Sequence, residues 1–221
     1  MIPPLVAATM LFWSTDLFAS FALGLNQEFS GGTAPVSNIF PWVNADFHDN
    51  GNGSVRLTLS NPHLTASENV SEFYFNFKDS LNLADLTFTF VNSSGSFTLP
   101  NAGDIAKSQN QFKADGDGLY DVRIDFAVGG NLNQTFGVGD QVVYDLAYTS
   151  PITAADFFFQ SFPDGGHGPF YAAAHVQNTG IHGNSSGWLA PVPEPTTLTL
   201  AAAMLAVPLG RRVIRSFRKQ A

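Results

Sequence analysis

The chain has 221 residues, enough for one or two domains, and it contains no cysteine, so disulfides cannot stabilise it. Its formal net charge at pH 7 is −8. The imbalance is larger in residues 23–191, where five cations accompany sixteen carboxylates, a net charge of −11, because the other five cations lie in the last eleven residues. Binding to nucleic acid is excluded by this balance, since it requires a cationic footprint.

The first 22 residues predict a signal peptide. An apolar run of suitable length covers residues 5–13, and Ser20 and Ala22 are small residues before a cleavage point after Ala22. No Lys or Arg precedes this run, and Asp16 places a charge shortly after it, so the segment is interpreted as a degenerate or truncated signal. A buried N-terminal strand is the alternative.

Residues 23–191 predict an all-β domain. In residues 119–128, Tyr120 and Val122 alternate with Asp121 and Arg123, which is the period of a half-buried strand. Clusters of Gly, Asn, Asp and Pro separate further segments of this kind. Other strands are predicted around residues 55–59, 73–77, 86–90 and 142–148, with less regular candidates at 96–99, 156–161 and 171–177.

This pattern indicates an antiparallel β-sandwich of jelly-roll or immunoglobulin-like type, because seven to nine short strands alternate with turn-rich joints. Residues 101–111 allow one or two helical turns at most. Without βα alternation, the α/β folds that house most nucleotide enzymes are excluded. No internal repeat is present, which excludes a solenoid.

An acidic turn at residues 115–121 predicts a candidate calcium site. Asp115, Asp117 and Asp121 occupy relative positions one, three and seven of a Gly-rich turn, and Ca²⁺ takes six to eight oxygen ligands. The further acids of an EF-hand loop are missing. Because Asp-Gly also favours a tight hairpin, a plain β-turn is the competing interpretation.

Three aromatic residues, Trp42, Tyr171 and Trp188, lie in segments rich in Gly and Pro. Exposed rings in such segments stack on sugar faces, which predicts association with extracellular polysaccharide. The alternative is that these rings close the ends of the β-domain.

Catalytic patterns are scarce, and we therefore expect no enzyme activity. A Gly-x-Ser-x-Gly frame for a serine nucleophile is missing. Only Glu28, Glu68 and Glu72 supply glutamates in residues 23–191, and a jelly-roll domain with two suitably placed carboxylates hydrolyses glycosides. A secreted carbohydrate-active enzyme is accordingly the alternative function.

The last thirty residues, 192–221, carry three consecutive features: the Pro193-Glu194-Pro195 box, an uncharged run over residues 196–210, and a basic end that begins with Arg211 and Arg212. As a helix the run would span roughly 22 Å at about 1.5 Å per residue. A bilayer core is about 30 Å thick, so the run predicts a short, transient membrane segment whose cations stay on the cytoplasmic side. A C-terminal helix packed on the domain is the alternative.

This order of parts resembles the C-terminal sorting signal of PEP-CTERM proteins of Gram-negative bacteria. The resemblance implies recognition by a membrane-embedded exosortase-type transpeptidase, anchoring in the inner membrane before processing, and delivery to the cell surface or the extracellular matrix. The sequence therefore predicts an exported, non-catalytic protein that acts by adhesion or polysaccharide association. No cofactor other than the candidate Ca²⁺ is expected.

Overall fold

The computed structural model describes residues 20–192 apart from residues 66 and 130. This part of the chain forms eleven β-strands and four short 3₁₀ helices, and no α-helix occurs in it. The strands are β1 (Ser20–Glu28), β2 (Val43–Asp49), β3 (Val55–Ser60), β4 (Asn69–Phe75), β5 (Thr87–Ser94), β6 (Ile105–Lys113), β7 (Leu119–Asp125), β8 (Phe136–Gly137), β9 (Gln141–Ala147), β10 (Ala172–Thr179) and β11 (Ser185–Pro191). The 3₁₀ helices are η1 (Leu83–Asp85), η2 (Ala102–Asp104), η3 (Leu132–Gln134) and η4 (Ala154–Phe157).

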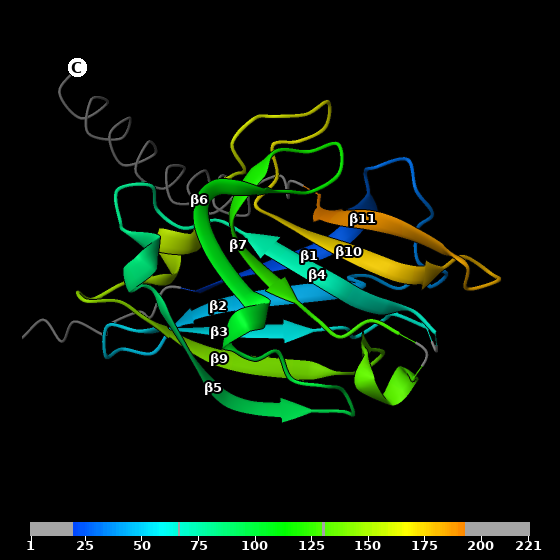
Figure 1. Ribbon diagram of the computed structural model, residues 1–221, viewed down its shortest axis with the longest axis horizontal. Helices are drawn as coiled ribbons and strands as arrows, with labels where there is room; N and C mark the ends of the chain where they lie inside the picture. Colours follow the sequence, from blue (N-terminus) through cyan, green and yellow to red (C-terminus); the bar gives the residue numbers. More distant parts are fainter. Residues whose placement is uncertain (1–19, 66, 130, 193–221) are drawn as a thin grey trace, which may run out of the picture.

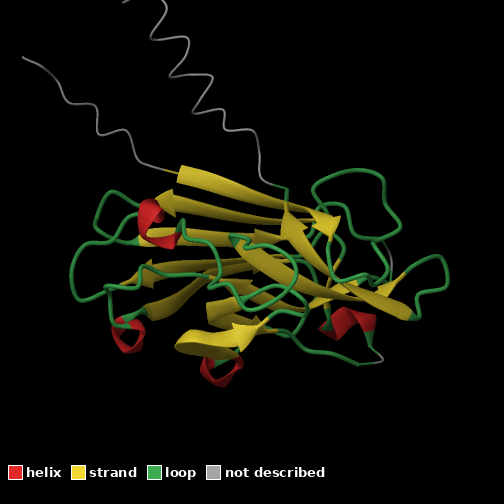
Figure 2. Ribbon diagram, turned by 90° about the horizontal axis from the view of Figure 1, so that it is seen from above, coloured by secondary structure: helices red, strands yellow, loops and turns green. Residues whose placement is uncertain are grey.

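All the strands belong to one antiparallel sheet in the order β5-β9-β3-β2-β1-β11-β10-β4-β7-β6, with β8 added beside β4. The sheet curls into a half-barrel (Figures 1 and 2). The all-β, antiparallel prediction is confirmed, whereas two separate sheets are not seen. The physical reason is the pairing of β1 with both β2 and β11, which joins the two halves into one ladder.

The inner face of the curled sheet holds the hydrophobic core. Phe47 of β2 packs on Phe75 of β4 with ring centroids 5.4 Å apart, and Phe75 also lies 6.4 Å from Phe88 of β5. Because β4 and β5 are remote from each other in the strand order, this contact shows that the sheet folds over its own core. Phe157 of η4 closes one end by packing 5.2 Å from Phe47.

A smaller apolar cluster lies on the opposite face of β4. Tyr74 stands between two core residues of that strand and packs against Tyr120 and Trp188, at centroid distances of 5.7 and 5.3 Å. Phe170, from the long loop between η4 and β10, belongs to the same cluster. Apolar contacts therefore hold this loop against the sheet.

Three segments differ from their predicted structure. Residues 156–161, expected as a strand, contain the end of η4 and the loop after it, because Asp156 Oδ2 accepts a hydrogen bond from Thr153 N at 2.9 Å and starts a 3₁₀ turn. Residues 96–99 lie outside any strand. Residues 101–111, where only helical turns were expected, contain η2 and most of β6.

The two predicted terminal segments lie largely outside the described residues. Within residues 20–192, no helix is long and apolar enough to cross a bilayer. The predicted membrane run at 196–210 and residues 1–19 of the predicted signal lie outside this range. The last three residues of that signal belong to β1, where Ser20 and Ala22 pair with His48 and Asp46 of β2.

Candidate functional site

A pocket of about 190 Å³ opens between the segment after β4, the strands β6 and β7, and the loop between η4 and β10. That loop lies beside the turn between β6 and β7, and Leu119 and Phe162 form an isolated β-bridge between them (Figure 1). The pocket is lined by amide, carboxylate, hydroxyl and aromatic side chains from Asn76, Asp79, Asn110, Asp121, Phe159, Gln160, Ser161, Phe162 and Pro163.

Asp121 of β7 lines this pocket and joins two neighbouring segments. Its side chain is buried, and its two oxygens accept hydrogen bonds from Phe77 N at 3.0 Å and Asn110 N at 2.8 Å. Burial raises the pKa of the Asp121 carboxyl, while the two backbone donors oppose that rise. Asn110 has a φ of 51°, a left-handed conformation that Asn tolerates better than most residues, so the carboxylate secures an irregular point of β6.

Asp117 organises the turn behind the pocket. Its buried carboxylate accepts hydrogen bonds from the Tyr120 hydroxyl and, at 3.2 Å, from Ser161 Oγ. Burial raises the pKa of Asp117, and it raises the pKa of Tyr120 well above its ordinary value. Ser161 Oγ in turn accepts a hydrogen bond from Phe170 N at 3.2 Å, so this network ties the long loop to the β6–β7 turn.

Gly118 allows the close approach of these two segments. A Cβ atom at position 118 would lie 2.2 Å from the carbonyl oxygen of Phe162 and 2.9 Å from Ser161 Oγ. Any side chain here would displace the loop that carries the pocket. The glycines of the predicted acidic turn therefore have a packing role that the sequence pattern alone does not reveal.

The three carboxylates of the predicted calcium site do not converge. Asp115 is exposed, Asp117 faces Tyr120 and Ser161, and Asp121 faces backbone donors. Within the part of the chain that the structure describes, no group of three or more His, Asp or Glu residues is arranged to hold a metal ion. Asp121 alone of the three lines the pocket.

The three aromatic residues predicted to stack on sugars lie in different places. Trp42 is buried and donates from Nε1 to the carbonyl oxygen of Ser37 at 2.7 Å. Tyr171 stacks on Phe158 with centroids 4.2 Å apart. Trp188 stacks on His175, on the outer face of the sheet, at 4.8 Å.

The rings with the greatest exposure near the pocket were not predicted from the sequence. Phe159 is 40% exposed and Phe162 is 55% exposed, and both line the pocket. Phe158, 43% exposed, follows η4 in the same loop. The run of three consecutive Phe residues at 157–159 is the sequence signal for these rings, but the same run also predicts a strand.

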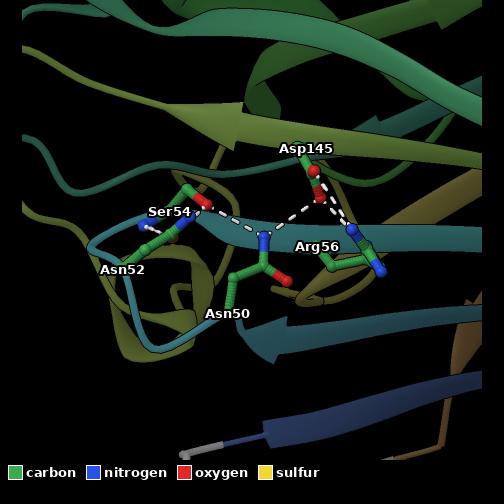
Figure 3. A network of polar contacts seen from close by, with 5 residues as sticks. All are labelled: Asn50, Asn52, Ser54, Arg56 and Asp145. Atoms are coloured by element: carbon green, nitrogen blue, oxygen red, sulfur yellow. Dashed lines mark hydrogen bonds and ion pairs between the residues drawn. The ribbon is translucent and has the colours of Figure 1, made fainter.

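A second polar turn, between β2 and β3, is held together by its own side chains (Figure 3). Asn50 Nδ2 donates to Ser54 Oγ at 2.9 Å and to Asp145 Oδ1 at 3.0 Å. Arg56 makes a two-point contact with Asp145, through Nε at 2.9 Å and a terminal nitrogen at 3.1 Å. The hydrogen bond from Arg56 holds the pKa of Asp145 below its ordinary value. These contacts join the turn to β9.

Each of the three glutamates in the described part of the chain accepts a hydrogen bond within the protein. Glu28 accepts a hydrogen bond from Ser30 N at 2.9 Å. Glu68 is buried and accepts from two backbone N–H groups, each at 2.7 Å. Glu72 accepts from the Tyr74 hydroxyl at 2.9 Å and stands directly opposite Asp125 in the β4–β7 register. Glu72 and Asp125 are therefore the glutamate and aspartate that the fold brings face to face on adjacent strands.

Comparison of the chain with protein-family models, curated proteins and solved structures finds no match. The sorting motif, with Pro193, Glu194, Pro195, Arg211 and Arg212, lies outside the described residues.

Proposed function

We propose that this protein is an exported surface or matrix component that associates with neutral extracellular polysaccharide without cleaving it. The order of a Pro-Glu-Pro box, a short apolar run and a basic end supports export through an exosortase-type pathway, with transient residence in the inner membrane. The excess of carboxylates in residues 23–191 favours neutral over acidic glycans, since like charges repel. Adhesion through such glycans is the resulting role.

The observation that carries this proposal is the pocket beside the half-exposed rings of Phe159 and Phe162. Sugar rings bind where an aromatic face meets a few polar groups, because their C–H faces are apolar and their hydroxyls need partners. The pocket lining contains both, since the two rings share it with the carboxylate of Asp79 and the amides of Asn76 and Gln160. The nitrogens of these amides donate to the carbonyl oxygens of Phe159, at 3.0 Å, and Pro169, at 3.4 Å.

The state of the carboxylates favours binding over hydrolysis at this pocket. Glycoside hydrolysis uses one carboxyl as a proton donor and a second as a base or nucleophile. Both oxygens of Asp121 are instead occupied by backbone N–H groups. Asp79 is then the remaining carboxylate in the lining.

The test is co-sedimentation of the full chain with insoluble neutral polysaccharides such as cellulose and starch granules. We expect saturable binding that Phe162→Ala weakens about fivefold to tenfold, which corresponds to about 1–1.4 kcal/mol for a lost ring contact. The backbone groups of Phe162 that bond to Leu119 are retained in this variant. Absence of wild-type binding to every neutral polysaccharide contradicts the proposal.

Phe40→Ala is the matched control, because Phe40 is 51% exposed and packs against Trp42 rather than lining the pocket. It removes a ring of similar exposure and is expected to leave binding unchanged. Equal weakening by both substitutions would show that the pocket is not the binding site.

A specific observation also favours the alternative of a secreted carbohydrate-active enzyme. Glu72 and Asp125 face each other across β4 and β7. Burial raises the pKa of Asp125, and the Arg123 guanidinium, 2.8 Å from Asp125 Oδ2, opposes that rise. Two carboxyl groups that flank the scissile bond are the requirement for glycoside hydrolysis. Release of reducing sugar that is lost in Glu72→Gln would establish this alternative.

A further inference from the structure

β5 forms one edge of the sheet, and no described strand pairs with its outer side (Figure 1). The strand contains no charge, proline or glycine, and the uncharged stretch continues from Leu86 to Gly103. Most residues of β5 are exposed, and the side chain of Phe90 is 47% exposed. Unpaired backbone groups along such an edge are a template for another strand.

The opposite edge, β6, is protected against strand addition. It carries Lys107, whose Nζ donates to the carbonyl oxygen of Leu86 just before β5, and Lys113, which pairs with Asp164 at 3.2 Å. Its pairing with β7 also loses register between Lys107 and Phe112. Asn110, at the irregular point, adopts a left-handed backbone. Charges and broken register are the devices by which proteins prevent edge pairing. The fold therefore guards β6, whereas no described strand pairs with the outer side of β5 from Thr87 onward.

The sequence of β5 is complementary to itself in an antiparallel pair. When Thr89 is placed opposite Thr89 of a second copy, Phe88 of each chain falls opposite Phe90 of the other. Cross-strand aromatic pairs of this kind stabilise antiparallel strands. The irregularity of the β5–β9 pairing lies between Phe90 and Asn92, so the three central residues of this pair, 88–90, are regular.

Charge also directs a second copy to this edge. Two bodies with an excess of carboxylates repel each other over most of their surface, whereas the stretch from Leu86 to Gly103 contributes no charge. Asp85 precedes the strand, so in the antiparallel pair the two Asp85 residues lie at opposite ends. Salt screens the remaining repulsion, and association should therefore strengthen as ionic strength rises.

From these observations we propose that two copies of this chain associate through antiparallel pairing of their β5 edges, centred on Thr89. The sheet then continues from one copy into the next. Each dimer then carries two pockets. The dimerisation itself does not depend on whether these pockets bind polysaccharide.

The test is sedimentation velocity of the full chain in mild detergent over a range of concentrations, with Thr89→Lys and Thr89→Glu as variants. The wild-type protein should reach the mass of a dimer, and both variants should associate at least about tenfold more weakly, because like charges meet at the two-fold axis. If the Lys and Glu variants both lose association to the same extent, a change in the net charge of the protein cannot be the cause.

Ser108→Lys and Ser108→Glu, at an exposed position of β6, are the matched controls and should associate like the wild type. Every protein keeps residues 193–221, so association through that segment would be equal in all of them. A wild-type protein that stays monomeric up to about 100 µM, or Thr89 variants that dimerise normally, would overturn the proposal.

Hydrogen exchange of the wild-type protein gives a second measurement that does not depend on a variant folding. The backbone amides of β5 should exchange more slowly as protein concentration rises, while those of β6 should not change. Exchange in β5 that is independent of concentration would also overturn the proposal.

Discussion

Replacement of Asp121 by Ala removes one carboxylate that serves two backbone donors. Asp121 accepts hydrogen bonds from Phe77 N, where the chain leaves β4, and from Asn110 N, in the irregular part of β6. Methyl at this position would leave both N–H groups without a protein acceptor. We therefore expect Asp121→Ala to destabilise the fold even though the residue lies at a pocket.

The magnitude depends on the burial of the two donors. An unsatisfied buried N–H costs about 1–3 kcal/mol. The bond to Phe77 is buried and the bond to Asn110 is partly buried, so water recovers part of the second loss. The substitution also removes the cost of burying the Asp121 carboxylate, the same burial that raises its pKa. This gain offsets a further part of the lost stability. The expected decrease in the free energy of unfolding is about 2–4 kcal/mol.

Urea denaturation followed by circular dichroism measures this change. Asp121→Asn keeps one acceptor oxygen and should lose about half as much stability. Asp115→Ala removes an exposed carboxylate from the same turn and should change stability by less than about 0.5 kcal/mol. If the stability of Asp121→Ala also stays within about 0.5 kcal/mol of the wild type, Asp121 does not stabilise the fold through its two backbone hydrogen bonds.

Three further predictions concern the metal, the pH dependence and the sorting signal. Because Asp115, Asp117 and Asp121 do not converge, millimolar Ca²⁺ should leave the melting temperature unchanged, and a rise that Asp117→Ala abolishes would restore the calcium hypothesis. Asp145→Asn should lower stability at neutral pH by at most about 1 kcal/mol. The Arg56 contact lowers the folded-state pKa of Asp145 below the ordinary value of 3.8. The stability that Asp145 contributes is therefore present above that value and disappears as pH falls through the lower, folded-state pKa. A stability difference between variant and wild type that stays constant down to about pH 2 would contradict this assignment. Mass spectrometry of the exported protein should show loss of the residues after about Pro195, whereas full-length exported protein would refute processing.

The fold class could be predicted from the sequence because alternation is a local signal. Val122 is expected on a buried face of β7, and its side chain is fully buried. The joining of the two halves of the sheet could not be predicted from local patterns, because the pairing of β1 with β11 connects residues more than 160 positions apart. Residues 20–22 also contain small and apolar residues suited to a signal peptide, which concealed the start of β1.

The site was predictable only in part, for a related reason. Asp121 was singled out for its spacing to other carboxylates, but its contacts come from Phe77 and Asn110, which the chain pattern does not bring together. The Phe residues at 157–159 share a strand-like pattern, yet hydrogen bonds to Asp156 turn the chain before they can form a strand. Their separation into one buried ring and two exposed rings depends on this turn.

The most direct test of the proposed function measures binding and cleavage in the same sample. Wild-type full chain is incubated with insoluble neutral polysaccharide, and bound protein and newly formed reducing ends are both quantified. Binding without turnover predicts a saturable bound fraction with reducing ends at the level of the protein-free control. Reducing ends that accumulate with time and protein concentration would contradict it.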